Sequence, residues 1–188
     1  MISYANRGKD LEEFLFYANM RYRHEGEAIV WKVPTAFLPI RNRKGQVIKC
    51  KVEGKSCVDY LGRVGNRPLA MEAKRTKGNS IRWDEVQDHQ AAFLDDFTDK
   101  NAGIGLVVIS FDLNSFYAIP WAFWSEARDA WKEAQRRGDK KAAIKTIMFN
   151  GQKWTTNGKA SVKEDELLPA WEVKMGGRIG LDYLREYI

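Results

Sequence analysis

The run Ile104–Phe111 constrains the fold more than any other segment, because its residues, Ile-Gly-Leu-Val-Val-Ile-Ser-Phe, are almost all apolar. Gly103 and Asp112 bound this run on either side. A short apolar run of this kind fits a strand that is buried on both faces of a sheet. We expect Ser115–Ile119, which ends at Pro120, to form the next strand.

Three segments are expected to form helices. Gly8–Arg23 carries apolar residues at helical spacing. Trp121–Arg137 has a stripe of tryptophans and alanines, which we interpret as core rather than as a platform for stacking bases. A third helix is expected from about Ile81 to Asp96, with Asn79 or Ser80 as its cap. Its core face would comprise Trp83, Val86, Gln90, Phe93 and Phe97.

The remaining pattern indicates a single α/β domain. Ala28–Val33 resembles a strand that Pro34 stops, and Leu181–Tyr187 gives a weak indication of a terminal helix. The order helix, three strands, helix, two strands predicts a mixed central β-sheet flanked by helices. We treat residues 1–188 as one domain, with 37–56 as a basic arm inserted in it.

Composition excludes several classes of protein. The chain is 44% hydrophobic and 30% charged, as ordinary globular proteins are, and it has no apolar run long enough to span a membrane. Its start resembles no signal peptide, and Cys50 and Cys57 form no metal pattern. A disulfide between them stays open, but a reduced cytoplasmic protein is favoured. The net charge of +6 favours an anionic partner.

The segment around Asp59 and Glu72 contains the candidate catalytic residues. Leu69–Lys74 is expected to be a strand, which places Glu72 and Lys74 on one face because side chains alternate. Gly62–Pro68 is expected to be a hairpin loop that brings Asp59 beside Glu72. Two such carboxylates can bind Mg²⁺, and the lysine can orient water or offset phosphate charge. The alternative is a solvent-facing hairpin with an incidental Glu–Lys pair.

Five segments then match one family in order over about residues 6 to 120. They are Asn6-Arg7-Gly8 with Glu12, Lys32-Val33-Pro34-Thr35, Ser56–Gly62, Glu72-Ala73-Lys74 and His89-Gln90. In these segments the chain resembles the RecU-type Holliday-junction resolvases of the PD-(D/E)xK nuclease superfamily. The resemblance implies a restriction-endonuclease-like core and a homodimeric, Mg²⁺-dependent endonuclease that cuts four-way DNA junctions symmetrically in recombination.

The chain also departs from the family pattern. Bacterial members usually carry a longer N-terminal extension, and they often have Asp where this chain has Glu72. The C-terminal third matches weakly, so no role is transferred to it. A short version of this kind would fit a phage or prophage enzyme. Two alternatives stay open, namely another DNA nuclease of the same superfamily and a recombination accessory that binds DNA without cutting it.

The resemblance implies roles for individual residues. Asp59 and Glu72 would hold Mg²⁺, or Mn²⁺ as a substitute, together with the backbone carbonyl of Ala73, and Lys74 would lie beside the attacking water. Glu12 would join the site, although it can equally be a carboxylate on the helix surface. Gln90, the polar residue in an apolar stripe, would either point into the active site or be a hydrogen-bonded core residue.

The DNA contacts are expected at two places. Arg7 would hold a phosphate, unless it is simply a solvated arginine near the end of the chain. The alternation in the arm predicts an extended strand with Lys44-Gly45 at the turn, and the resemblance implies that the arm projects as a stalk and contacts the junction centre, through Arg41, Arg43 and Lys44. Its alternative is a solvated edge hairpin whose basic residues discourage strand pairing. Recombination proteins are further expected partners.

Overall fold

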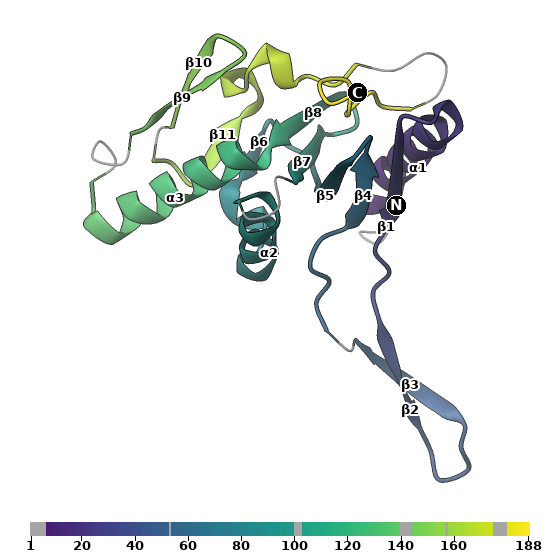
Figure 1. Ribbon diagram of the computed structural model, residues 1–188. Helices are drawn as coiled ribbons and strands as arrows, with labels where there is room; N and C mark the ends of the chain where they lie inside the picture. The colour runs from purple at the N-terminus through teal and green to yellow at the C-terminus, as the bar shows by residue number, and fades with distance from the viewer. Residues whose placement is uncertain (1–6, 53, 100–102, 140–143, 157, 175–179) are drawn as a thin grey trace.

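The strand β7, Ile104–Phe111, lies in the middle of the protein, and all its residues are buried, as the sequence predicts. The structure is a computed structural model that describes residues 7–52, 54–99, 103–139, 144–156, 158–174 and 180–188. β7 belongs to a five-stranded sheet in the order β1-β4-β5-β7-β8 (Figure 1). It runs parallel to β5, and the other neighbours are antiparallel. The other strands of this sheet are β1 (Ala28–Lys32), β4 (Tyr60–Val64), β5 (Arg67–Thr76) and β8 (Ser115–Pro120).

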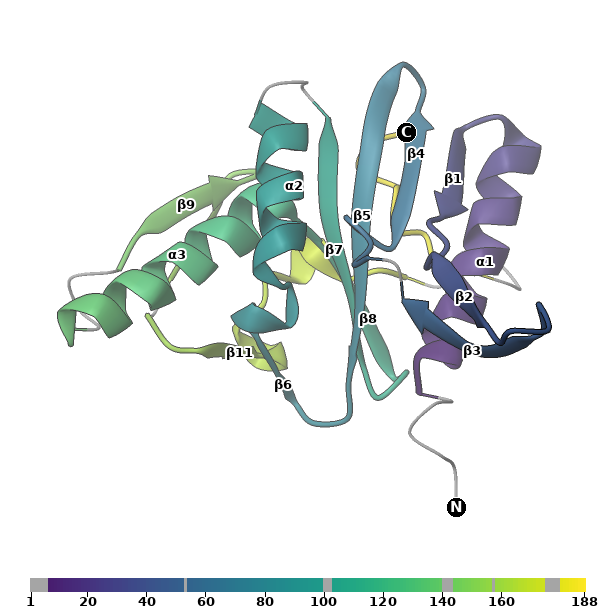
Figure 2. The same cartoon turned by 90° about the horizontal axis from the view of Figure 1, so that it is seen from below.

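Helices cover both faces of this sheet, which explains the burial of β7. Figure 2 shows α1, Arg7–Glu25, on one side and α2, Asp88–Asp99, with α3, Trp121–Arg137, on the other. Alternate residues of β7 divide between the two cores, so that Leu106 packs in the core under α1 and Val107 in the core under α2 and α3. The expected mixed sheet flanked by helices is confirmed.

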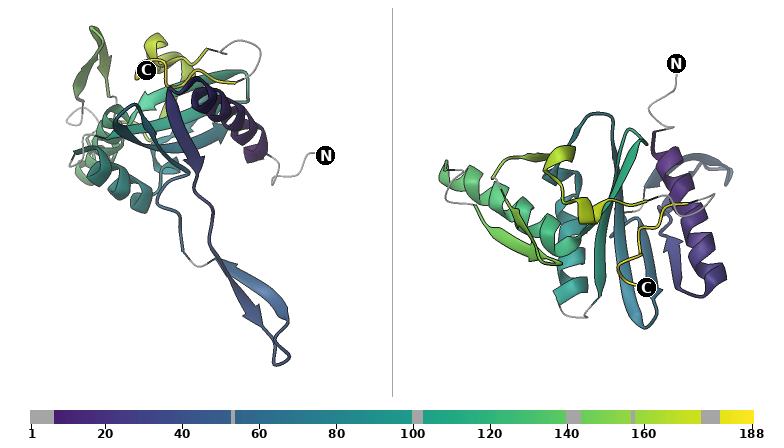
Figure 3. Two further views of the ribbon diagram at one scale, coloured as in Figure 1. Left: turned by 45° about the vertical axis from the view of Figure 1, so that its right-hand side comes forward. Right: turned by 90° about the horizontal axis from the view of Figure 1, so that it is seen from above.

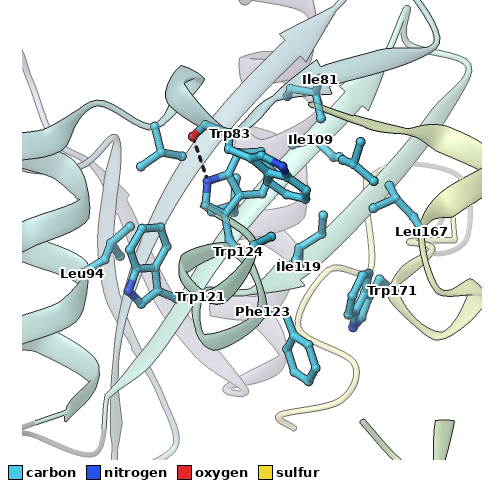
Figure 4. Close-up of a cluster of buried hydrophobic side chains, with 14 of the residues drawn as sticks. Ile81, Trp83, Leu94, Ile109, Ile119, Trp121, Phe123, Trp124, Leu167 and Trp171 are labelled. Atoms are coloured by element: carbon cyan, nitrogen blue, oxygen red, sulfur yellow. Dashed lines mark hydrogen bonds between the residues drawn. The ribbon is translucent and has the colours of Figure 1, made fainter. Parts of the chain in front are cut away.

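Tryptophans of α3 form part of the second core. Trp121 is 2% exposed and Trp124 is fully buried. The indole of Trp124 donates a hydrogen bond of 3.3 Å to the Trp83 carbonyl, and the two rings meet edge to face with centroids 4.9 Å apart (Figure 4). The interpretation of these tryptophans as core residues is therefore confirmed, and they are not available for stacking on bases.

The expected helix from Ile81 to Asp96 is wrong in its first half. Ser80–Arg82 is the strand β6, which pairs with β11, Ser161–Lys163, and Trp83–Glu85 is a single 3₁₀ turn. Pairing with a distant segment satisfies the backbone groups of β6, and local periodicity gives no sign of it. The helix α2 begins only at Asp88, so neither Asn79 nor Ser80 caps it. Its fully buried apolar residues are Ala91 and Leu94, whereas Phe93 and Phe97 are partly buried.

The C-terminal part also differs from expectation. Leu181–Tyr187 forms an isolated bridge and consecutive turns rather than a helix. The aperiodic stretch before it holds an antiparallel hairpin of β9, Thr146–Phe149, and β10, Gln152–Thr155. Two 3₁₀ turns, Glu164–Glu166 and Pro169–Trp171, follow β11. Trp154 and Trp171 from this region pack 5.5 Å apart against the core under α3, which ties the region to the sheet.

The hairpin of β4 and β5 is confirmed, but its loop is shorter than expected. The strands extend to Val64 and from Arg67, which leaves only Gly65-Asn66 between them. Gly65 has a φ of +54°. A two-residue turn with such a residue is typical of tight hairpins, and Asn-Gly type sequences favour it. The expected loop Gly62–Pro68 is therefore mostly strand.

Gly62 lies where β1 and β4 approach each other closely. A Cβ atom at this position would lie 2.1 Å from the Ile29 carbonyl oxygen, which belongs to a fixed strand. We expect Gly62→Ala to lower the free energy of unfolding by about 1–3 kcal/mol or more, as overpacking does. Gly78→Ala is the control, because nothing lies within 4 Å of its Cβ position. Equal urea midpoints for the two variants would contradict this close approach.

A two-stranded hairpin projects from the core as a stalk. It consists of β2, Phe37–Arg41, and β3, Val47–Val52, paired antiparallel (Figures 1 and 3). Every residue of both strands is exposed. Gly45 in the turn has a φ of +78°, which matches the predicted turn at Lys44-Gly45. The projecting basic arm expected from the sequence is thus present, and we call Phe37–Val52 the stalk.

Candidate active site

The β4–β5 hairpin positions the candidate site. Asp59 directly precedes β4, and Glu72 and Lys74 lie on β5. The register pairs Tyr60 with Met71, so Asp59 comes opposite Glu72. Met71 packs under α1, and the alternation of the strand then turns Glu72 and Lys74 to the other face, as expected.

Two hydrogen bonds from backbone N–H groups hold the carboxylates of Asp59 and Glu72 beside each other. The Asp59 backbone N–H donates to Glu72 Oε2 over 3.1 Å. The Ala73 backbone N–H donates to Asp59 Oδ2 over 3.1 Å. Each carboxylate is thereby fixed by the backbone beside the other, which restricts its rotation. The predicted approach of Asp59 to Glu72 is present in the structure.

Lys74 completes the group. Its Nζ lies 2.7 Å from Glu72 Oε1, and the two side chains are 18% and 1% exposed. Burial and the nearby charge of Asp59 raise the pKa of Glu72 to about 7, although Lys74 acts in the opposite direction. When both carboxylates are charged, Asp59, Glu72 and Lys74 together carry one net negative charge. A bound cation would offset this charge where water has little access.

Gln90 is both a core residue and a neighbour of the site. It is 8% exposed, and its Nε2 donates to Glu72 Oε1 over 2.6 Å. Its Oε1 accepts a bond of 2.9 Å from the Gln87 backbone N–H. The two interpretations that the sequence leaves open are therefore compatible, because the satisfied amide also orients a site carboxylate. His89 lies at the flank, with Nε2 3.1 Å from the Ser56 carbonyl.

Glu12 lies on α1 and has a different partner. Its Oε2 is 2.7 Å from Lys32 Nζ, and its side chain is 44% exposed. Burial, followed by the charges of Glu12 and Asp59, raises the pKa of Tyr60. Within the described residues, no three His, Cys, Asp or Glu side chains form a group that could hold a metal. The structure thus does not bring Glu12 into the Asp59–Glu72 pair, and its role stays a prediction.

Two contacts near the site were not predicted from the sequence. Lys32, the ion-pair partner of Glu12, lies on a separate element, so only the fold brings the two together. Gln87 supports Gln90 in the pattern of a capping box, in which a side chain accepts from the backbone three residues earlier. The spacing of Gln87, directly before α2, and Gln90, in its first turn, was the available signal. Arg7 is the first residue of α1, and Asn6 lies outside the described residues.

Comparison with known proteins assigns the chain to a family. The family model of Recombination protein U, RecU, matches residues 6–185. The chain belongs to the RecU family. This match extends through the C-terminal third, where the sequence patterns were weakest. No helix within the described ranges is long and apolar enough to cross a membrane.

Similar proteins include curated members of this family. The Holliday junction resolvase RecU of Bacillus pumilus is 28% identical over 190 residues, covering 97% of this chain and 80% of the relative. That of Geobacillus thermodenitrificans is 33% identical over 144 residues, covering 73% of this chain and 70% of the relative. The solved structure of the Archaeoglobus fulgidus resolvase Hjc has a TM-score of 0.38 and 14% identity, covering 63% of this chain and 77% of that one.

Proposed function

We propose that this chain is a Holliday-junction resolvase, a metal-dependent endonuclease that cuts four-way DNA junctions symmetrically during recombination. The observation that carries the proposal is the pair of carboxylates of Asp59 and Glu72, each held by a backbone N–H beside Lys74, in a chain of the RecU family. The relatives named above are resolvases. The proposal also places the enzyme in the cytoplasm, where bacterial or phage DNA is recombined.

The donor atoms at the site suit a hard divalent cation. The carboxylates of Asp59 and Glu72 would hold Mg²⁺, or Mn²⁺ as a substitute, with the Ala73 carbonyl and Glu12 as further candidates. The pKa of the buried Glu72 carboxyl is raised, and a bound cation would stabilise the charged form of this carboxyl. When bound, such an ion polarises a phosphate and acidifies water.

The side chains of the chain itself perform the remaining tasks. Lys74, with its ammonium at 2.7 Å from Glu72, would orient the attacking water and offset negative charge on the scissile phosphate. Gln90 fixes the rotamer of Glu72 through its 2.6 Å bond. Because backbone groups and Gln90 already hold the carboxylates, little reorganisation is needed when substrate arrives.

A cleavage assay tests the proposed function. Labelled four-way junction, linear duplex and single strand are incubated with the protein in Mg²⁺ or in EDTA. We expect cutting of the junction only, and only with the metal. Equal cutting of duplex would favour a general nuclease of the same superfamily. Binding without cutting would favour a non-catalytic recombination accessory.

A homodimer would supply the two active sites that symmetric cutting needs. An exposed apolar surface formed by Phe16, Met20 and Trp31 supports this part of the proposal. Trp31 lies on β1, which is at one edge of the central sheet. These residues line a hollow of about 490 Å³ between α1 and β1. Exposed apolar surface beside a sheet edge is typical of an interface.

We therefore expect light scattering to give a dimer mass at micromolar concentration. Met20→Glu should shift the protein toward the monomer, because a charge would be buried at the interface. Met148→Glu is the matched control, since Met148 is 61% exposed on β9, far along the chain from this surface. A monomer mass for the wild type, at concentrations where junctions are cut, would contradict the dimer.

A further inference from the structure

A second hollow, lined by charged residues, lies between the base of the stalk, the start of α2 and α3. Its volume is about 370 Å³. Figure 2 shows α2 and α3 side by side on the same face of the sheet. The charged and titratable residues that line the hollow are Lys55, Asp84, Asp88, His89, Arg128 and Lys132.

Three cations from two parts of the chain converge on this hollow. Arg128 and Lys132 lie one turn apart on α3, and Lys55 lies on the segment that leads from the stalk back to the core. Arg128 is only 7% exposed, and its Nε has no hydrogen-bond partner among the described residues. The guanidinium meets the hollow at its Nη2, which contacts the exposed Asp88 carboxylate, and a largely buried guanidinium is stabilised by an anion at this nitrogen.

An exposed carboxylate already bridges two of these cations. Asp88 Oδ1 contacts Nη2 of Arg128 and lies 2.8 Å from Nζ of Lys132, yet the Asp88 side chain is 85% exposed. Asp88 is also the first residue of α2, where backbone N–H groups and the helix dipole favour negative charge. Asp84 is paired with Arg82, whose Nε and Nη2 donate to its two carboxylate oxygens over 2.8 and 2.7 Å. The carboxylate that an outside anion would displace from Arg128 and Lys132 is therefore that of Asp88.

A chain of hydrogen bonds connects this hollow to the catalytic carboxylates. Lys55 Nζ donates to Gln87 Oε1 over 2.8 Å. The backbone N–H of Gln87 donates to Gln90 Oε1, and Gln90 donates to Glu72. The hollow thus adjoins the site on the side where the stalk rejoins the core. DNA that reaches the active site from the stalk would pass close to it.

We propose that this hollow is a subsite for a backbone phosphate of a junction arm, in which the phosphate replaces the Asp88 carboxylate between Arg128 and Lys132. The proposal rests on the proposed function, since it concerns DNA bound at the same active site. Guanidinium and ammonium groups contact phosphate oxygens without reading bases. The subsite would therefore hold the arm of any sequence and of either a junction or a duplex.

The test measures binding of a four-way junction, and of a duplex with the same arm sequence, in EDTA over a series of salt concentrations. Lys132→Ala should weaken both complexes by about three- to tenfold and reduce the salt slope by about 0.9, the effect of one phosphate contact. Asp88→Asn should tighten both, because the competing charge is removed and Asn is tolerated at a helix start. Lys145→Ala is the control, as it also removes an exposed, ion-paired lysine, 2.7 Å from Glu126.

Two results would overturn the subsite. One is binding by Lys132→Ala that is no weaker than binding by Lys145→Ala. The other is binding by Asp88→Asn that is unchanged or weaker, in a variant whose melting temperature equals that of the wild type. Cleavage of the junction by the wild type in Mg²⁺, measured on the same preparation, separates this failure from failure of the proposed function.

Discussion

Replacing Asp59 by Asn, or Glu72 by Gln, should reduce junction cleavage by at least about a thousandfold, since a lost metal ligand removes several kcal/mol of transition-state stabilisation. Junction binding should stay close to wild type, because the basic surface of the stalk is unchanged. Asp59→Asn keeps an oxygen that can accept from the Ala73 backbone N–H. Glu72→Gln keeps one oxygen, which can accept either from the Asp59 N–H or from Gln90 and Lys74, so this variant should lose some stability. A urea titration of both variants separates loss of cleavage from loss of fold.

Lys74→Ala distinguishes the role of the lysine from that of the ligands. We expect a comparable loss of cleavage, because the ammonium beside Glu72 would no longer act on water and phosphate. Metal binding, measured by calorimetry with Mn²⁺, should persist in this variant and weaken in Asp59→Asn and Glu72→Gln. Near-wild-type turnover in all three purified variants would show that Asp59, Glu72 and Lys74 do not form the active site.

The second large effect is expected at the stalk. Replacing Arg41, Arg43 and Lys44 by alanine should weaken binding of a four-way junction more than binding of a linear duplex. The salt slope should become shallower by up to about 2.7, which corresponds to three phosphate contacts. Every residue of the two stalk strands is exposed, so truncation at the tip should leave the core and the proposed metal site intact.

A matched charge control is available for this experiment. Replacing Lys145, Lys153 and Lys159, all exposed and all outside the stalk, removes the same charge from the surface. This control should weaken both DNAs less than the stalk variant does. If the stalk variant lost affinity equally for junction and duplex, the stalk would be an electrostatic patch without preference for branched DNA.

Strong local patterns made part of the fold predictable. The strand Ile104–Phe111 and the helix Trp121–Arg137 have the predicted bounds, because an unbroken apolar run and a periodic stripe are properties of the segment itself. The approach of Asp59 to Glu72 was also accessible, since a hairpin joins residues close in sequence. The basic residues and the turn at Lys44-Gly45 predicted an exposed hairpin, whereas its projection as a stalk was implied by the family resemblance.

Contacts between distant segments were not accessible from local patterns. The residues 80–82 have a helical pattern in sequence, but pairing with Ser161–Lys163 makes them a strand. The ion pair of Glu12 with Lys32 and the bond from Gln90 to Glu72 likewise depend on how α1 and α2 pack against the sheet. The family resemblance indicated Glu12 and Gln90 as site residues, and it contained no information about their partners.

The most direct test of the account is to map the cuts in a four-way junction with each strand labelled in turn, in Mg²⁺. A homodimeric resolvase should nick two opposite strands at symmetric positions near the branch point. The products should then be nicked duplexes that a DNA ligase seals. Cuts in one strand only, cuts scattered along the arms, or products that cannot be ligated would contradict symmetric resolution by this protein.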